Sequence, residues 1–358
     1  MEGLVGLHDR AVLVTGHTGF KGGWLALWLA DLGARVHGYA LAPPTEPNLF
    51  EVARVSEALA SDTRADLADR EALSATLDRV RPEVVFHLAA QPLVSEGHRD
   101  PLGTMATNVI GTAHLLDAIR TVDSVRAVVV VATDKVYENR ELGRAFTEGD
   151  PLGGHDPYSA SKAAAELVVA SYRSSYFGDG RHPARVASAR AGNVIGGGDW
   201  ASHRLVPDCL RSFAEGAPVH LRHPESVRPW QHVLAPLSGY LALAVRLIGA
   251  GGEGFARAWN FGPDAGDEAS VGEVAQRLAA LWGDGASVAG DADPRWSESG
   301  LLRLDSSQAR GELGWSPSWS LQQALEHTVA WHRAWRRGEA MQAVCREQIA
   351  AYLQAAVP

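Results

Sequence analysis

Two short stretches of the chain carry side chains that together could perform acid–base chemistry. A polar triplet, residues 133–135, follows the apolar run 128–131, and Tyr158 lies four residues before Lys162. That separation places the phenol and the ammonium one turn apart on the same face of a helix. A cation beside a phenol stabilises the phenolate, so Tyr158 is a candidate general base. The same pair also occurs by chance on amphipathic helices, so its meaning depends on the segments around it.

The position of the polar triplet indicates a role in a ligand site. The run 128–131 consists of four valines, which is typical of a strand buried in a parallel sheet. Open α/β sheets bind their ligands beyond the carboxyl ends of their strands. Thr133, Asp134 and Lys135 lie at such an end. A helix is predicted to follow from Tyr158 to about residue 177.

A glycine-rich turn near the start of the chain indicates a dinucleotide. The strand predicted at 11–15 runs into glycines at 16, 19, 22 and 23, and an apolar helix follows. Glycines let the backbone approach a pyrophosphate, and the N-terminus of the helix offers free N–H groups. The alternative, a tight turn without a ligand, fits the place of this motif less well. The residues expected to hold a nicotinamide dinucleotide here are Gly16, Thr18, Gly19, Phe20, Lys21 and Gly22.

Two further strand ends belong to the predicted cofactor site. The fourth strand ends in Ala89, Ala90 and Gln91, and the small residues let a cofactor lie close. The second strand ends in residues 39–41, without the acidic residue that usually binds the adenosine ribose. The glycine turn and the fourth strand therefore predict a cofactor, while recognition of its ribose is left open.

The lack of a well-placed cation at the end of the second strand favours NAD over NADP. A 2′-phosphate is usually bound by a cation near the end of that strand. Arg35 lies at the start of the strand instead, and Lys21 and Arg64 are the nearest alternatives. None of them plainly serves a 2′-phosphate, so we expect NAD to be preferred.

The order of elements predicts an α/β fold. Strands and helices alternate up to about residue 190, as in a doubly wound parallel sheet. We expect a Rossmann domain over residues 1–190 that also receives about 228–262, and a smaller C-terminal substrate lobe formed mainly by 191–358. The other segments expected to be helical are 108–119, 205–215, 237–248, 270–282 and 320–335.

Composition narrows the class of protein. The 358 residues are 46% hydrophobic and 21% charged, and a formal net charge of −9 argues against non-specific binding of nucleic acid. No run approaches the ~20 apolar residues of a membrane span. The first residues do not resemble a signal peptide, and two cysteines make a disulfide framework unexpected, so we expect a cytoplasmic protein. Only His220 and His223 of the 14 histidines lie close together, so no metal site is predicted.

Seven longer strings are distinctive. They are Thr15-Gly-His-Thr-Gly-Phe-Lys-Gly22, Ala89-Ala-Gln-Pro-Leu-Val94, Thr133-Asp-Lys135, Asp156-Pro-Tyr158-Ser, Arg190-Ala-Gly-Asn-Val-Ile-Gly-Gly-Gly-Asp-Trp200, Arg228-Pro-Trp-Gln-His-Val233 and Trp259-Asn-Phe-Gly262. On these strings the chain resembles the extended short-chain dehydrogenase/reductase superfamily. Within it, almost the whole chain resembles the CDP-glucose 4,6-dehydratase family. The strings at 190–200 and 228–233 are the most specific.

The resemblance implies a reaction, a cofactor and an assembly. CDP-D-glucose would be dehydrated to CDP-4-keto-6-deoxy-D-glucose by internal hydride transfer through a bound NAD that is not consumed. A homodimer or a dimer of dimers would form through a four-helix bundle of helices that begin near Asn108 and Ser159. The residues expected to contact the adenine are Asp66 and Leu67, and those expected to contact the nucleotide sugar are Asn193, Arg228 and His232.

Each residue of the predicted reaction centre has an expected role. Tyr158 as phenolate takes the proton of the sugar C4 hydroxyl, while Lys162 supports the phenolate and holds the nicotinamide ribose. Thr133 hydrogen-bonds the forming 4-keto oxygen. Asp134 donates a proton to the departing C6 hydroxyl, and Lys135 is the candidate base at C5.

Two alternatives share most of these residues. One is another nucleotide-sugar 4,6-dehydratase or a 4-epimerase of the same superfamily, although an epimerase has no use for an acid at C6. The other is a catalytically silent dinucleotide sensor, which is expected to lose Tyr158 or Lys162. The chain departs from the family at 95–98 (Ser95 to His98) and at Met105, near the expected sugar site, so the nucleobase and the sugar stay open.

Overall fold

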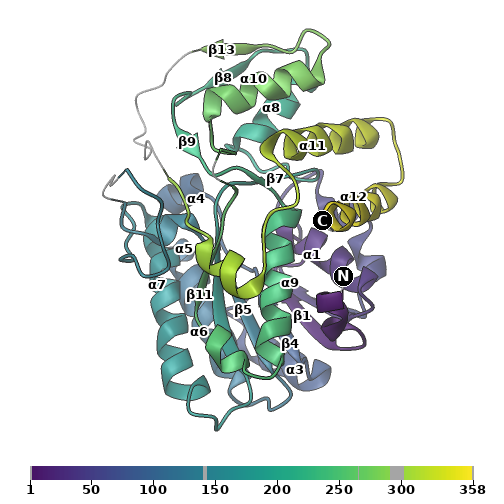
Figure 1. Cartoon of the computed structure of the whole chain (residues 1–358). Coiled ribbons are helices and arrows are strands. Elements are labelled where there is room, and N and C mark those ends of the chain that lie inside the picture. Colours follow the sequence, from purple (N-terminus) through teal and green to yellow (C-terminus); the bar gives the residue numbers. More distant parts are fainter. Residues whose placement is uncertain (1, 140–142, 265, 291–301, 357–358) are drawn as a thin grey trace.

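A computed structural model describes residues 2–139, 143–264, 266–290 and 302–356. In these residues the chain builds a sheet of seven strands, with helices on both of its faces (Figure 1). The strand order is β11-β6-β5-β4-β1-β2-β3, and every neighbouring pair is parallel. The predicted doubly wound sheet is confirmed. The strands are β1 (Ala11–Thr15), β2 (Arg35–Ala40), β3 (Ser61–Arg64), β4 (Val84–His87), β5 (Ala127–Thr133), β6 (Arg185–Ala191) and β11 (Ala258–Phe261).

Alternating side chains of the central strands account for the two helical layers. Val12 and Val14 of β1 belong to one apolar core, whereas Leu13 between them belongs to another. Successive side chains of a strand point to opposite faces, so each face needs its own helices to exclude water. The first core contains α1 (Phe20–Asp31) and α9 (Leu234–Ile248), and the second contains α3 (Arg70–Val80), α6 (Gly111–Ile119) and α7 (Pro157–Tyr172).

A smaller lobe with its own apolar core lies at one end of the sheet (Figure 1). Between its segments the chain returns to the main sheet as α9 and β11. A role for this lobe in binding a nucleotide sugar stays a prediction. Its helices are α8 (Leu205–Ala214), α10 (Val271–Trp282) and α11 (Leu321–Arg336), and its short strands pair as β7 (Val194–Ile195) with β10 (Gln231–His232), β8 (Val219–Leu221) with β13 (Val288–Gly290), and β9 (Val227–Arg228) with β12 (Ala269–Ser270).

The helix expected from residue 108 begins earlier than predicted. α5 (Pro101–Met105), a π-helical turn (Ala106–Ile110) and α6 follow one another without interruption. Asp100 caps α5, because its side chain accepts a hydrogen bond from the Gly103 N–H at 2.9 Å. A capping aspartate followed by proline is a strong start signal, so the helix begins there rather than at Asn108.

A helix that was not predicted, α12 (Met341–Ala355), packs against α1. The rings of Trp28 and Tyr352 meet edge to face, with their centroids 6.0 Å apart. Met341, Cys345 and Ile349 are buried at a spacing of four residues, which aligns them on one face. Like every other helix of the described ranges, α12 is too short or too polar to cross a membrane.

Candidate active site

The glycine turn needs residues without a side chain, because two of its glycines lie directly against other backbone atoms. Gly16 has a φ of 76°, and a Cβ atom there would lie 2.6 Å from the backbone nitrogen of Ala89. A Cβ atom on Gly22 would lie 2.1 Å from the Gly16 oxygen. A Cβ atom on Gly19, in contrast, would meet only the Gly16 oxygen among the described residues, at 3.4 Å. α1 begins at Phe20, and none of the described side chains caps it, so its first N–H groups can receive a pyrophosphate. The turn therefore fits the phosphates of a dinucleotide.

The other residues of the turn have defined places. Gly19 is the N-cap of α1, and the Thr18 hydroxyl donates a hydrogen bond to the Leu41 carbonyl at 3.1 Å. Burial, together with the nearby cations Arg204 and Lys162, lowers the pKa of Lys21 to about 7. The half-buried Lys21 side chain thus lies in the region of the reaction centre.

The predicted adenine contacts lie beyond β3. Asp66 accepts a hydrogen bond from the Tyr39 hydroxyl on its carbonyl, at 2.6 Å, and its carboxylate accepts one from the Ala68 N–H, at 2.9 Å. Leu67 is buried, and its carbonyl lies 3.0 Å from His114 Nδ1 in α6. These bonds fix the loop after β3, and contact with an adenine stays a prediction.

A residue without a predicted contact role, Asn108, joins the β4 exit loop to α7. Its amide oxygen accepts from the Gln91 N–H at 2.8 Å, and its amide nitrogen donates to the Gln91 carbonyl at 3.1 Å. The same nitrogen donates to Ser161 Oγ at 2.8 Å. Ala89, Ala90 and Gln91 are therefore held at a fixed distance from the helix of Tyr158. Asn108 was expected only as a helix start, because its partners are remote in the sequence.

The polar triplet forms a compact turn at the end of β5, in which Asp134 is buried and the other two residues are half-buried. The Thr133 hydroxyl donates to Asp134 Oδ1 at 2.9 Å and accepts from the Lys135 N–H at 3.3 Å. Asp134 is 2% exposed, and its other oxygen, Oδ2, has no hydrogen-bond partner among the described residues. Burial raises the pKa of Asp134, against the opposing influence of Lys135, the Thr133 hydrogen bond, Arg228 and Lys21. A raised pKa suits a carboxyl group that must hold a proton.

Tyr158 lies beside the triplet, at the start of α7. Burial raises the pKa of Tyr158 to about 12, while a side-chain hydrogen bond with Thr133 and the charge of Arg204 oppose the rise. Lys162 donates a hydrogen bond from Nζ to the Val131 carbonyl of β5 at 2.8 Å. Burial lowers the pKa of Lys162 to about 8. Support of a Tyr158 phenolate by Lys162 stays a prediction.

Arg204, just before α8, is a further cation of the site that was not predicted. Its guanidinium donates to Asp199 Oδ2 at 2.9 Å, which anchors it at the loop that follows β7. Its charge acts on both Tyr158 and Lys21. In the sequence Arg204 reads as an ordinary residue before a helix, and only the fold brings it to α7.

The three predicted substrate residues have different surroundings. Asn193 is half-buried, and its carbonyl accepts from the Gln231 N–H at 3.0 Å. Arg228 is buried, and its charge acts on Asp134, which places it beside the reaction centre. His232 is fully buried, and its ring meets that of Trp319 at 4.8 Å. The structure gives His232 a packing role, and substrate contact by these residues stays a prediction.

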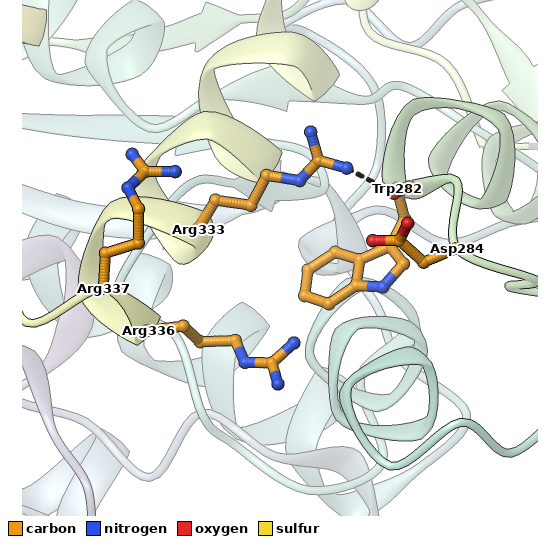
Figure 2. Close-up of a pocket in the computed structure, with 5 residues that line it drawn as sticks. All are labelled: Trp282, Asp284, Arg333, Arg336 and Arg337. Atoms are coloured by element: carbon orange, nitrogen blue, oxygen red, sulfur yellow. Dashed lines mark hydrogen bonds between the residues drawn. The ribbon is translucent and has the colours of Figure 1, made fainter.

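A surface hollow of about 260 Å³ lies apart from these residues, between the ends of α10 and α11 (Figure 2). None of the predicted site residues lines it. Arg333 donates a hydrogen bond to the Trp282 carbonyl, and the Arg336 guanidinium lies 5.5 Å from the centre of the Trp282 ring. The residues that line it are Trp282, Asp284, Arg333, Arg336 and Arg337.

A protein-family model and individual known proteins both match this chain. A model of the NAD dependent epimerase/dehydratase family matches residues 12–246. A CDP-glucose 4,6-dehydratase of Salmonella typhimurium is 47% identical over 349 residues, which are 97% of each chain. A dTDP-glucose 4,6-dehydratase of Streptomyces griseus is 34% identical over 70% of this chain and 73% of its own.

Solved structures show the same similarity in space. The dTDP-glucose 4,6-dehydratase DesIV of Streptomyces venezuelae, solved with NAD bound, superposes with a TM-score of 0.77. It is 26% identical, and the match covers 92% of this chain and 98% of that one. A UDP-glucose 4-epimerase of Thermotoga maritima, 23% identical, shares the fold with a TM-score of 0.77, covering 91% of this chain and 99% of its own.

Proposed function

The chain belongs to the NAD dependent epimerase/dehydratase family, and we propose that it dehydrates CDP-D-glucose to CDP-4-keto-6-deoxy-D-glucose. The buried Asp134, with one oxygen bonded to Thr133 and the other without a partner among the described residues, carries the proposal. Loss of water from C6 requires a proton donor, which this carboxyl group can be. Similarity to a CDP-glucose 4,6-dehydratase over 97% of the chain supports the same reaction.

The cofactor is NAD, whose nicotinamide supplies a reversible hydride acceptor when bound. The glycine turn would receive its phosphates, because the first N–H groups of α1 have no side-chain cap among the described residues and the Cβ position of Gly19 is nearly open. Asp66 and Leu67 would lie against the adenine, and Ala89, Ala90 and Gln91 against the middle of the cofactor. Lys162 would hold the nicotinamide ribose, with the ring of Tyr158 packed beside the cofactor.

The side chains of the reaction centre divide the proton transfers among them. Tyr158 takes the proton of the C4 hydroxyl, and the Thr133 hydroxyl donates a hydrogen bond to the same oxygen as it becomes a ketone. The ketone acidifies C5, where Lys135 removes a proton. Asp134 protonates the C6 hydroxyl as it leaves. Because burial raises the pKa of Tyr158 to about 12, its phenolate depends on nearby cations, of which Arg204 is one.

A 4-epimerase of the same family is the second candidate, since such an enzyme shares the fold. It needs a base at C4 but no acid at C6. The protonated Asp134 that burial favours has no task in that reaction. The geometry therefore favours dehydration.

The proposal is tested by incubating the protein with NAD and a panel of CDP-, dTDP-, UDP- and GDP-glucose. We expect a 4-keto product, detected by its ultraviolet absorbance in base, from CDP-glucose above all. With CDP-glucose deuterated at C4, the label should appear at C6 of the same molecule. Deuterium that stays at C4 or is lost to solvent would exclude the dehydratase assignment.

We also infer that the enzyme assembles from copies of its chain through α5, the following π-turn and α7. These neighbouring segments carry three large exposed apolar side chains, and the π-helical turn after α7 (Arg173–Phe177) adds a fourth: Leu102 (82% exposed), Ile110 (51%), Leu167 (61%) and Tyr176 (40%). Replacing Leu167 by Asp should lower the molar mass measured by light scattering, whereas Asp at Val5, which is 68% exposed elsewhere, should not. A cytoplasmic location remains part of the proposal.

A further inference from the structure

The end of β2 lacks the carboxylate that usually recognises the adenosine ribose of a dinucleotide. β2 ends beside the glycine turn, where the Gly16 N–H donates to the Tyr39 carbonyl at 2.9 Å. Tyr39 points its hydroxyl away to the Asp66 carbonyl, and Leu41 is 59% exposed. Ala40 between them offers only a methyl group, so the end of β2 has no side-chain acceptor for a ribose hydroxyl.

The neighbouring strand, β3, supplies a carboxylate at the corner that the glycine turn forms with β2 and β3. In the β2–β3 pairing, Gly38 lies opposite Asp62 and Ala40 opposite Arg64. Directly paired residues of parallel strands carry their side chains on the same face of the sheet. That face is the one of the glycine turn, because His17 fills the place of a Gly38 side chain, 2.5 Å from where its Cβ atom would be.

Asp62 is bound to the turn and to Arg64 at the same time. Its Oδ1 lies 2.8 Å from His17 Nε2, and its Oδ2 accepts from the Arg64 guanidinium at 2.9 Å. Arg64 also donates to the Leu41 carbonyl at 3.2 Å and lies 4.5 Å from the centre of the Phe50 ring, in α2 (Leu49–Val52). The two side chains keep 27% and 35% of their surface exposed, so a ligand can reach them.

We propose that Asp62 takes the place of the missing β2 carboxylate and, by holding Arg64, sets the preference for NAD over NADP. Each carboxylate oxygen can accept two hydrogen bonds, so Asp62 can still accept one from a ribose 2′-hydroxyl. A 2′-phosphate carries about −1.5 to −2 charges and is repelled by Asp62, while Arg64 is already engaged. This inference rests on the NAD site of the proposed function.

The test is equilibrium binding of NAD and of NADP to the full chain freed of nucleotide, measured by calorimetry. Asp62→Asn keeps the shape and the bond to His17 but removes the charge and releases Arg64. We expect about tenfold weaker binding of NAD and about tenfold tighter binding of NADP, each equivalent to about 1.4 kcal/mol. Asp62→Asn combined with Arg64→Gln should lose the gain for NADP, because the only released cation is gone.

A matched control is Asp123→Asn, which breaks the exposed ion pair of Asp123 with Arg81 elsewhere on the surface and should leave both affinities unchanged. An Asp62→Asn protein that melts as a folded protein and keeps the wild-type ratio of NADP to NAD affinity would overturn the inference alone. Wild-type protein that binds neither dinucleotide would overturn the proposed cofactor, and the inference with it.

Discussion

Asp62, inside β3, and Asp134, just beyond the end of β5, belong to the same sheet, yet their surroundings give them opposite properties. Asp62 keeps 27% of its side chain exposed and has both oxygens bonded, to His17 and Arg64. Asp134 is 2% exposed, and its Oδ2 has no partner among the described residues. A paired, partly exposed carboxylate can select a ligand through its hydrogen bonds, whereas burial raises the pKa of Asp134 and so favours a proton that it can donate.

Removal from water, and not the number of nearby cations, determines the pKa of Asp134. Lys135, Arg228 and Lys21 all favour the charged form of Asp134, yet desolvation outweighs them and raises its pKa. One sheet edge therefore offers a region of recognition, at β2 and β3, and a region of proton transfer, at β5 and α7. Mutations should separate the two regions cleanly.

The largest expected effect is at Tyr158. Tyr158→Phe should lower kcat by at least about 10³, near the upper range for loss of an acid–base group, because only the proton acceptor is removed. NAD affinity should stay within about threefold of wild type, since the ring still packs and the corner at Asp62 is untouched. Steady-state kinetics and calorimetry give both values. Retention of more than a few per cent of the wild-type rate would show that Tyr158 is not the base.

Asp134→Asn should slow product formation by roughly 10²–10⁴, the usual contribution of a general acid. The amide keeps the acceptor for Thr133 but has no proton of suitable acidity. Asp62→Asn serves as the matched control: with saturating NAD it should keep kcat within about twofold. Equal losses of kcat in the two variants would mean that recognition and proton transfer are not separated as described.

The same Asp134→Asn variant should be more stable than wild type at neutral pH. A pKa raised in the folded state means that folding favours the protonated carboxyl, so wild type loses stability as pH rises past the ordinary value of 3.8. The stability gain of the variant should therefore vanish near pH 3 and reach a plateau above the raised pKa. Thermal melting over this pH range measures it, and a gain independent of pH would contradict this origin.

The smallest effect is expected from Arg64→Gln on stability. The pair of Arg64 with Asp62 is about one-third exposed, and pairs of that kind contribute about 0.2–1 kcal/mol, less at high salt. Urea unfolding of the variant should therefore differ from wild type by less than about 1 kcal/mol. A loss several times larger would mark the corner as part of the structural core instead of a hydrated recognition surface.

Short sequence patterns predicted the strands, the glycine turn and the helix of Tyr158, because these features depend on interactions between residues close in the sequence. The valine run of β5, the glycine turn and the spacing of Tyr158 and Lys162 each act within a few residues. The role of Asp62 was not predicted, because the sequence does not show that β3 pairs with β2 in a register that sets Asp62 opposite Gly38.

Residues whose surroundings come from several segments were the least predictable. His232 lies in a string that suggests ligand binding, but Trp24 and Trp319 from distant parts of the chain surround its ring. Arg204 and Asn108 likewise gain their partners only through the fold. The role and the exposure of such a residue depend on contacts with distant segments, which no short sequence pattern encodes.

The packing of α12 on α1 has a consequence for synthesis on the ribosome. Trp28 is synthesised long before Tyr352, whose ring covers its edge. In a nascent chain that stops short of α12, the face of α1 that packs on α12 is therefore uncovered. The nucleotide-binding half of such a chain lacks part of its apolar packing until α12 has been made.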